Sequence, residues 1–315
     1  MKTMAKFLAL VLTLMLAMTA AAGAEGIGGK QVALMTPYLG SVTTNQMVEY
    51  IQAGLEAQGA SVTVINTNND FAELASRIED VSYSGNTDAI VLVSADPSQV
   101  ANQLQEAFDA EIPVFGCDSG FIEGMTINAT SDNHQMGELI TRYLFEDLMG
   151  GKGTVIALTH RPHPGVVKRS EAFDEIIKEY PEISLITEQH IPAEQPINDA
   201  QTTVENLLLA NAAEGSVTAI WAGWDEPAIG STQALMEVSR GEVVVTGVDG
   251  NQQALALIAE GTNLKATVSQ NFEGMAAIVV EQMTKLFAGE EVIPGEMYAP
   301  ATLITAENVS EFIAK

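Results

Sequence analysis

The sequence predicts an α/β protein built on parallel β-sheets, and two observations support that prediction. Short runs rich in Val and Ile alternate along the chain with segments whose apolar residues recur every three or four positions. Most of the Val- and Ile-rich runs are continuously apolar, as strands covered on both faces by helices require. A repeated strand–helix order forms parallel sheets with right-handed crossovers. A length of 315 residues suits two such sheets better than one.

The individual elements follow from these two patterns. The first helix is expected where Met47, Ile51 and Leu55 recur at intervals of four, and Gly59 supplies its C-terminal stop. Similar apolar stripes predict helices around residues 71–78 and 136–143. No long Pro- or Ser-rich linker separates the halves, so short crossings should join them. Strands are expected at residues 31–35, 61–65, 89–93, 112–115, 154–158, 217–221, 243–248 and 264–268.

The N-terminal segment differs in character from the rest. Lys2 and Lys6 precede an apolar run over residues 7–22, which leads into the small residues Ala22-Gly23-Ala24. This order is typical of an export signal over residues 1–24, cleaved before Glu25. The alternative is an N-terminal membrane anchor, but the run is shorter than the roughly 20 residues that a span needs. We therefore expect a soluble protein in the periplasm.

Composition excludes several classes of function. The chain has 41 acidic and 14 basic residues, a formal net charge of −27. Such a charge argues against nucleic-acid binding and against attachment to anionic lipid, since both need a basic face. With 47% apolar and 17% charged residues, the chain is not a disordered acidic segment. The single cysteine, Cys117, allows no internal disulfide and no Cys-rich metal site.

Polar side chains gather where the expected strands end, and ligands of parallel α/β sheets bind at that edge. The strand-end segments are Asp118-Ser119, His160 to Arg169, Trp224-Asp225-Glu226, Asp249-Gly250 and Gln270-Asn271. Carboxylates accept hydroxyl protons, arginine donates in a fixed fork, and an aromatic ring covers the C–H face of a sugar. This mixture of side chains suits a polyhydroxylated ligand.

Six motifs, in this order, resemble those of the type I periplasmic sugar-binding proteins, above all the ribose-binding branch. The likeness covers essentially all of the mature chain. The motifs are IPVFGCD at 112–118, ATSDN at 129–133 followed by Gly137, RSEAF at 169–173, WDEPAIG at 224–230, VTGVDG at 245–250 and ATVSQ at 266–270.

The resemblance implies two similar Rossmann-like lobes that close over a ligand about a hinge of three crossings. These crossings are expected near Ser131, Gln270 and Ala301. The N-terminal lobe would comprise residues 25–131 and 271–300. The C-terminal lobe would comprise residues 132–270 and 301–315.

The resemblance also implies ligand contacts, although the chain departs from the ribose-binding pattern. Ser119 and Trp224 stand where that pattern has an arginine and an asparagine, and Gln195 falls near a lost phenylalanine. The loop at 40–46 lacks the paired phenylalanines of the pattern, so ribose is not carried over as the ligand. The expected ligand-binding residues are Asp118, Ser119, Asn133, Arg169, Trp224, Asp249 and Gln270. Further candidates are Tyr38, Thr43, Thr44, His160, Arg161 and Gln195.

The basic stretch from His160 to Arg169 allows two interpretations. Its charges either form a positive spot for a carboxylated or phosphorylated sugar, or face solvent with only Arg169 turned inward. The pair His160 and His163 has no evident third ligand, so neither a metal site nor a cofactor is expected.

No catalytic constellation is evident. Asp225 and Glu226 are adjacent and point apart, whereas a glycosidase needs carboxyl groups that face each other across a gap of about 5–9 Å. Asp225 is expected at the N-cap or first turn of a helix, and Cys117 as a small buried residue. Neither a nucleophile elbow nor a phosphate-binding loop occurs, so we expect no enzyme.

Two functions remain at this point. In the first, a monomer captures a sugar or polyol and delivers it to the permease of an ABC transporter. In the alternative, the same fold presents its ligand to a chemoreceptor or sensor kinase. A related repressor is disfavoured, because the N-terminus carries an export signal and no basic helix-turn-helix.

Overall fold

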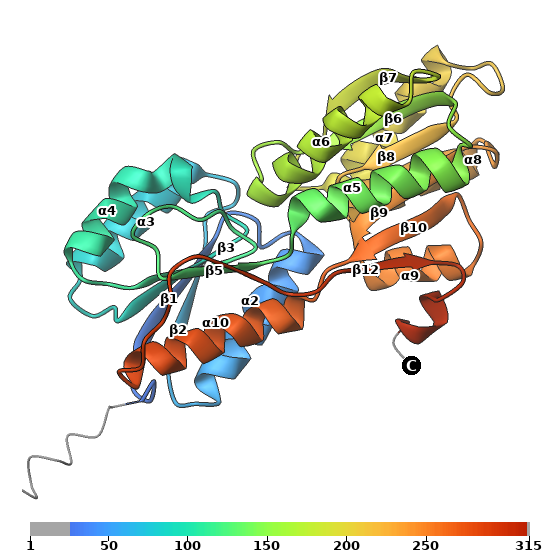
Figure 1. The fold of residues 1–315 in the computed structure, drawn as a ribbon. Coiled ribbons are helices and arrows are strands. Elements are labelled where there is room, and N and C mark those ends of the chain that lie inside the picture. The colour runs from blue at the N-terminus through green and yellow to red at the C-terminus, as the bar shows by residue number, and fades with distance from the viewer. Residues whose placement is uncertain (1–25, 314–315) are drawn as a thin grey trace, which may run out of the picture.

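The structure is a computed structural model that describes residues 26–313. The export signal expected over residues 1–24 lies outside the described residues. The described chain forms two α/β lobes, each with one six-stranded sheet covered by helices on both faces (Figure 1).

The first lobe contains a sheet of six parallel strands in the order β11-β5-β4-β3-β1-β2. Its helices cover the two faces in pairs, with α2 and α10 on one face and α3 and α4 on the other. The strands are β1 (Gln31–Thr36), β2 (Ser61–Asn66), β3 (Ala89–Val93), β4 (Val114–Cys117), β5 (Ile127–Thr130) and β11 (Glu296–Tyr298). The helices are α2 (Val42–Glu56), α3 (Phe71–Tyr83), α4 (Ala101–Asp109) and α10 (Phe272–Phe287).

The second lobe repeats this plan with the strand order β12-β10-β9-β8-β6-β7, in which only β12 is antiparallel to its neighbour. Helices α5 and α6 cover one face, and α7, α8 and α9 cover the other. The strands are β6 (Gly153–Thr159), β7 (Ile183–His190), β8 (Ala219–Ala222), β9 (Val244–Asp249), β10 (Leu264–Ser269) and β12 (Thr302–Thr305). The helices are α5 (Asn133–Tyr143), α6 (Pro164–Ile176), α7 (Pro196–Ala210), α8 (Asp225–Glu237) and α9 (Gln252–Ala259). Short helical turns lie at Pro97–Val100, Leu144–Leu148, Ile177–Glu179 and Val309–Glu311.

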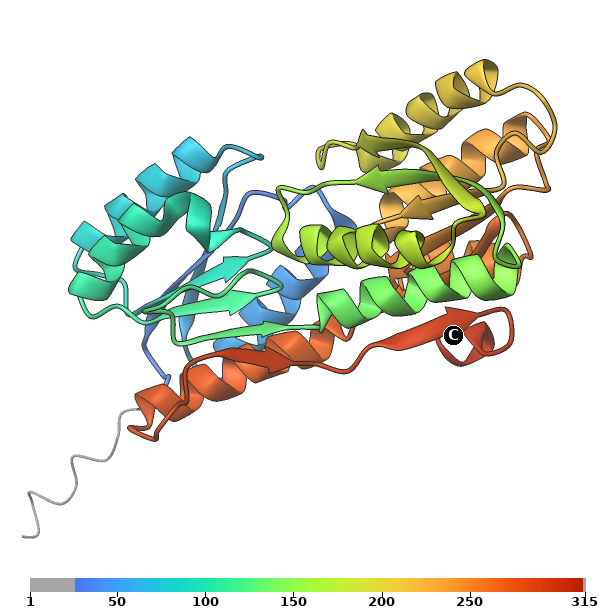
Figure 2. The same ribbon diagram turned by 45° about the horizontal axis from the view of Figure 1, so that its top comes forward.

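Three segments connect the lobes, and all run along the same side of the molecule (Figures 1 and 2). The chain crosses between β5 and α5, between β10 and α10, and between β11 and β12. At two crossings a side chain caps the helix that follows: Asp132 accepts from the N–H of Gln135, and Asn271 accepts from the N–H of Gly274. The helix starts beside the hinge are thereby fixed to the connecting segments.

Most of the expected strands are present, although two begin two residues later than expected and four strands of the structure were not expected. Strand β3 has the expected bounds, but the strand expected at 112–115 begins at Val114 and the one expected at 217–221 begins at Ala219. Strands β5, β7, β11 and β12 were not anticipated. Three of these have only three or four residues, and β7 has mostly half-exposed or exposed side chains.

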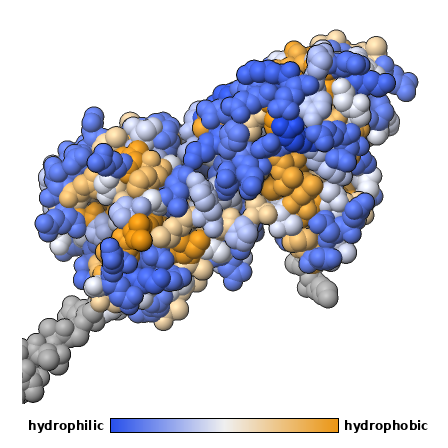
Figure 3. All heavy atoms as spheres, viewed as in Figure 1, coloured by the Kyte–Doolittle hydropathy of each residue, from blue (hydrophilic) through white to orange (hydrophobic). Residues whose placement is uncertain are grey.

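The molecular surface is largely polar. On the face shown in Figure 3, hydrophilic side chains cover most of both lobes, with smaller hydrophobic areas between them. Within residues 26–313, the structure contains no helix with the length and apolar character needed to cross a membrane.

Candidate ligand-binding site

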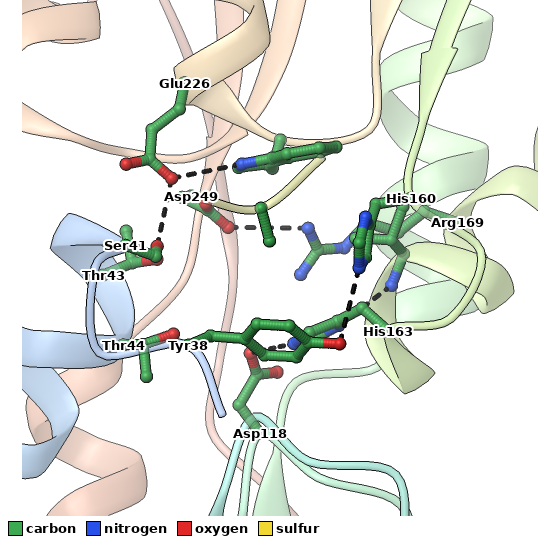
Figure 4. Close-up of a pocket in the computed structure, with 13 residues that line it drawn as sticks. Tyr38, Ser41, Thr43, Thr44, Asp118, His160, His163, Arg169, Glu226 and Asp249 are labelled. Atoms are coloured by element: carbon green, nitrogen blue, oxygen red, sulfur yellow. Dashed lines mark hydrogen bonds and ion pairs between the residues drawn. The ribbon is translucent and has the colours of Figure 1, made fainter. Parts of the chain in front are cut away.

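A cleft of about 450 Å³ lies between the two lobes, at the carboxyl ends of the strands of both sheets. The first lobe contributes residues that follow β1 and β4. The second lobe contributes residues that follow β6, β7 and β8, together with the end of β9, the first two turns of α6 and the first turn of α8. The lining residues are Tyr38, Ser41, Thr43, Thr44, Asp118, His160, His163, Val166, Ala193, Arg169, Trp224, Glu226 and Asp249 (Figure 4).

Asp118 enters the cleft from the end of β4 and has an unsatisfied oxygen. Its Oδ2 lies 3.6 Å from Nε2 of His163, which comes from the other lobe, and its Oδ1 has no hydrogen-bond partner. Burial raises the pKa of Asp118 to about 6, while the positive charges of Arg169 and Lys168 act in the opposite direction. The carboxyl group is therefore placed to accept hydrogen bonds from a ligand.

Arg169 is held rigidly by groups of the second lobe. Its Nε donates to Oδ1 of Asn133 over 2.8 Å, and its Nη1 donates to the carbonyl of Gly223 over 2.9 Å. The same Nη1 lies 3.5 Å from Oδ1 of Asp249, and only 1% of the arginine surface is exposed. These contacts fix the direction in which the guanidinium faces the cleft.

Asp249 ends β9 and joins the cleft to the hinge. Its Oδ1 accepts from Nε2 of Gln270 over 2.8 Å, and Gln270 lies at the crossing between β10 and α10. Burial raises the pKa of Asp249 well above its usual value, and the guanidinium of Arg169 opposes that shift.

Tyr38 and His160 face each other across the lobes. The hydroxyl oxygen of Tyr38 lies 3.4 Å from Nε2 of His160, and Nδ1 of His160 lies 3.0 Å from the carbonyl oxygen of Ile191. Because a carbonyl only accepts, Nδ1 carries the proton, and Nε2 accepts from the Tyr38 hydroxyl. Burial lowers the pKa of His160 and raises that of Tyr38 to about 12, so both groups are neutral at physiological pH.

His163 caps helix α6 and thereby has a defined tautomer. Its Nδ1 accepts from the N–H groups of Gly165 and Val166, at 3.0 and 3.4 Å. The proton of the neutral ring is then on Nε2, the atom that faces Asp118. Burial, followed by the charge of Arg169, lowers the pKa of His163 well below its usual value. His163 is therefore a neutral hydrogen-bond donor at the interface of the lobes.

Glu226 joins the lobes at the other side of the cleft. Its carboxylate accepts from the indole N–H of Trp224 over 3.2 Å and from the hydroxyl of Ser41 over 3.0 Å. It also accepts from the N–H of Val42 over 3.3 Å. Ser41 is the N-cap residue of α2, but its own side chain does not cap that helix. A carboxylate of the second lobe therefore occupies the position of a helix cap on the first lobe.

The expected residues Asp118, Arg169, Trp224 and Asp249 all line the cleft, as do the candidates Tyr38, Thr43, Thr44 and His160. Two other expected residues lie behind this lining. Asn133 holds Arg169, and Gln270 holds Asp249. Both residues therefore contact the cleft through the side chains that they hold.

Ser119, Arg161 and Gln195, which were also expected near the ligand, do not line the cleft. The hydroxyl of Ser119 is buried and donates to the carbonyl of Leu92. Arg161 makes ion pairs with Glu188 and with Asp174 outside the cleft. Gln195 is exposed in front of α7.

The basic stretch therefore contributes one charged group to the cleft. Lys168 pairs with Glu296, and Arg161 with its two acids, so that only Arg169 faces inward. His160 and His163 line the cleft in neutral form.

The expected site did not include Ser41, His163, Val166, Ala193 and Glu226. The sequence could have indicated His163, because a histidine directly before Pro164 at a helix start can act as an N-cap. Glu226 gave no such signal, because its partners lie on the other lobe. Asp225, expected at a helix start, opens α8 but is fully buried and accepts from the hydroxyl of Thr267 and the N–H of Asn251.

Residues 32–291 match a family model described as a periplasmic binding protein domain. The chain belongs to the periplasmic binding protein family. It is 29% identical to the D-apiose import binding protein of Actinobacillus succinogenes over 229 residues. This aligned region covers 71% of each of the two chains. The chain is 24% identical over 277 residues to the ribose import binding protein of Salmonella typhimurium, 88% of this chain and 91% of the relative.

A solved structure supports the same assignment. An ABC transporter solute-binding protein from Agrobacterium vitis with bound allitol superposes with a TM-score of 0.84 at 26% identity, over 90% of this chain and 98% of that one. The protein is thus a member of the sugar- and polyol-binding group of ABC transporter solute-binding proteins, and this family consists of binding proteins.

Proposed function

We propose that this periplasmic binding protein captures one sugar or polyol between its lobes and delivers it to the permease of an ABC transporter. The observation that supports this proposal is a cleft between the lobes in which hydrogen-bonding groups of both lobes converge. The cleft is enclosed by buried side chains, so a ligand there would exchange nearly all its water for protein contacts.

The lining groups complement the chemistry of a polyhydroxylated ligand. Asp118 and Asp249 accept from hydroxyl groups, whereas Arg169 and the Nε2–H of His163 donate to hydroxyl or ring oxygens. The indole of Trp224 supplies an apolar surface for C–H groups. A ligand lacking a matching hydroxyl would leave a buried acid or arginine unpaired, which is the basis of discrimination.

Closure couples binding to transport. The contacts of Ser41 and Val42 with Glu226, and of Tyr38 with His160, exist only while the lobes are together. A ligand that contacts Asp118 on one lobe and Arg169 on the other adds to these contacts. It therefore shifts the population towards the closed form, which the permease would recognise. Residues 1–24 would act as a cleaved signal for export to the periplasm.

A ligand screen tests this function. Pentoses, hexoses, linear polyols and inositols are tested for thermal stabilisation at pH 7.5, followed by calorimetry and recovery of the ligand. At a concentration of 100 times the dissociation constant, a true ligand stabilises the folded form by about 2.7 kcal/mol. We expect a small set of compounds to do so and to be recovered chemically intact. The proposal fails if none of them binds or if a bound compound is converted to product.

His163 provides a test of the site itself. His163→Asn removes the Nε2 donor but retains an oxygen that can cap α6, whereas His163→Ala removes both. Both variants are expected to lose roughly tenfold in affinity, the value of one good hydrogen bond. The free energy of unfolding of the asparagine variant should be about 1 kcal/mol higher than that of the alanine variant.

Calorimetry and urea unfolding measure the two effects separately. If both variants bind as tightly as the parent protein, the Nε2–H does not contact the ligand. If the two variants unfold at the same urea concentration, the cap contributes nothing to the stability of α6.

A further inference from the structure

The cleft and its immediate surroundings contain more buried negative than positive charge. Among the described residues around it, four carboxyl groups are at most 5% exposed, and Arg169 is the one buried guanidinium. The four are Asp118, Asp225, Glu226 and Asp249. The nearby cations Arg161 and Lys168 both pair with acids outside the cleft, although the charge of Lys168 still acts on Asp118.

Three of these carboxyl groups have protein partners that stabilise their charge. Asp249 has Arg169 and the amide of Gln270. Asp225 accepts from a hydroxyl and a backbone N–H, at 2.7 and 2.8 Å. Glu226 accepts three hydrogen bonds and lies at the positive N-terminal end of α2.

Asp118 is stabilised less well. Arg169, Lys168 and Thr130 favour its charged form, but burial outweighs them and raises its pKa to about 6. The nearest cation-forming group at its oxygens is the neutral His163 at 3.6 Å, beyond hydrogen-bond distance, and its Oδ1 is buried and unpaired. The next residue, Ser119, is uncharged and donates to the main chain. In Figure 4 the carboxyl group of Asp118 points into the cleft from below, towards Tyr38 and His163. Burying a carboxylate with so little support is costly, and a positively charged group of the ligand would reduce that cost.

We propose that the cleft selects its ligand by charge, taking a sugar or polyol that carries a protonated amine against Asp118 and rejecting sugar acids and sugar phosphates. This inference rests on the proposed function. A ligand hydroxyl gives Asp118 a hydrogen bond but leaves its charge unbalanced. An ammonium group gives both the hydrogen bond and the missing charge, and such charge-assisted bonds are roughly twice as strong as neutral ones. An anionic group would add a further negative charge to a buried site that already has an excess.

Matched sets of three compounds test the inference at pH 7.5, at which a carboxyl group with a pKa of about 6 is ionised. One set is D-glucitol, 1-amino-1-deoxy-D-glucitol and D-gluconate, and another is D-glucose, D-glucosamine and D-glucuronate. The set that contains the tightest neutral binder is extended to the other positions of substitution. We expect the best amine to bind about tenfold more tightly than its neutral parent, and each acid at least about tenfold more weakly.

Two variants distinguish an effect of the Asp118 charge from an effect of the overall negative charge of the protein. Asp118→Asn keeps the size of the side chain but removes its charge, so the amine and its neutral parent should then bind with similar affinity. Arg161→Ala removes a charge whose partners lie outside the cleft, and the order of the three compounds should stay unchanged. The order of affinities of the three compounds for the parent protein is itself a test. This test does not depend on whether either variant folds.

The outcomes distinguish this inference from the function on which it rests. An acid that binds as tightly as its neutral parent would overturn charge selection, and so would amines that all bind more weakly than the neutral compound. In both cases a neutral sugar or polyol still binds, and the proposed function stands. If no compound of any charge binds, the proposed function itself is wrong.

Discussion

Arg169→Ala is expected to abolish ligand binding and to lower the free energy of unfolding by about 3 kcal/mol. The side chain is buried, and its removal leaves Asp249 without a cation and two acceptors, Oδ1 of Asn133 and the Gly223 carbonyl, without their donor. Breaking one side of a buried ion pair costs about 3–5 kcal/mol. The lower end applies here, because burial already raises the pKa of Asp249 and its carboxyl group can take up a proton.

Urea unfolding and calorimetry of single and double variants check this expectation. The double variant Arg169→Ala with Asp249→Asn has no buried charge at this position, so it should regain part of the lost stability but none of the binding. A single variant that unfolds at the urea concentration of the parent protein would contradict the assigned burial. A double variant no more stable than the single one would show that the loss comes from packing and not from charge.

The class of fold could be predicted from the sequence because burial on both faces imposes a simple pattern. Strand β3 is buried on both faces, so every one of its residues must be apolar. Such a continuous apolar run can be recognised in the sequence. The edge strand β7 lacks this constraint, since Leu185 and its neighbours are partly exposed. Strands β11 and β12 are too short for any periodicity, and their pairing depends on the crossings of the hinge.

The sequence predicts only those site residues that lie at strand ends, where ligands of parallel α/β sheets bind. That rule brought together Asp118, Arg169 and Asp249, which do line one cleft. It could not separate Arg161 from His163, because the two lie in the same loop and differ only in direction. Their directions are set by Glu188 on β7 and by the start of α6, and neither partner is evident from local sequence. Glu226 has partners on the other lobe, so only the closed arrangement reveals its role.

Gly137→Ala is expected to reduce both stability and ligand affinity, although alanine favours a helix over glycine by about 1 kcal/mol. A Cβ atom at Gly137, on α5, would lie 2.6 Å from the carbonyl oxygen and 2.7 Å from the Cα of Arg169, on α6. These are backbone atoms, which cannot rotate away, so the two helices must separate. Overpacking of this kind costs about 1–3 kcal/mol. The displaced segment carries Arg169 itself, so its guanidinium would shift relative to Asp249.

Gly241→Ala is the matched control, because a Cβ at Gly241 would have no heavy atom within 4 Å. We expect its unfolding free energy to change by less than about 0.5 kcal/mol, as for other surface substitutions, and its affinity to remain that of the parent protein. Since Gly137 itself does not line the cleft, any loss of affinity in Gly137→Ala must be transmitted through α6. Equal unfolding midpoints for the two variants would show that α5 and α6 can separate at no cost. Lower stability with unchanged affinity would instead show that Asn133 and Gly223 hold the guanidinium in place even when the backbone of Arg169 moves.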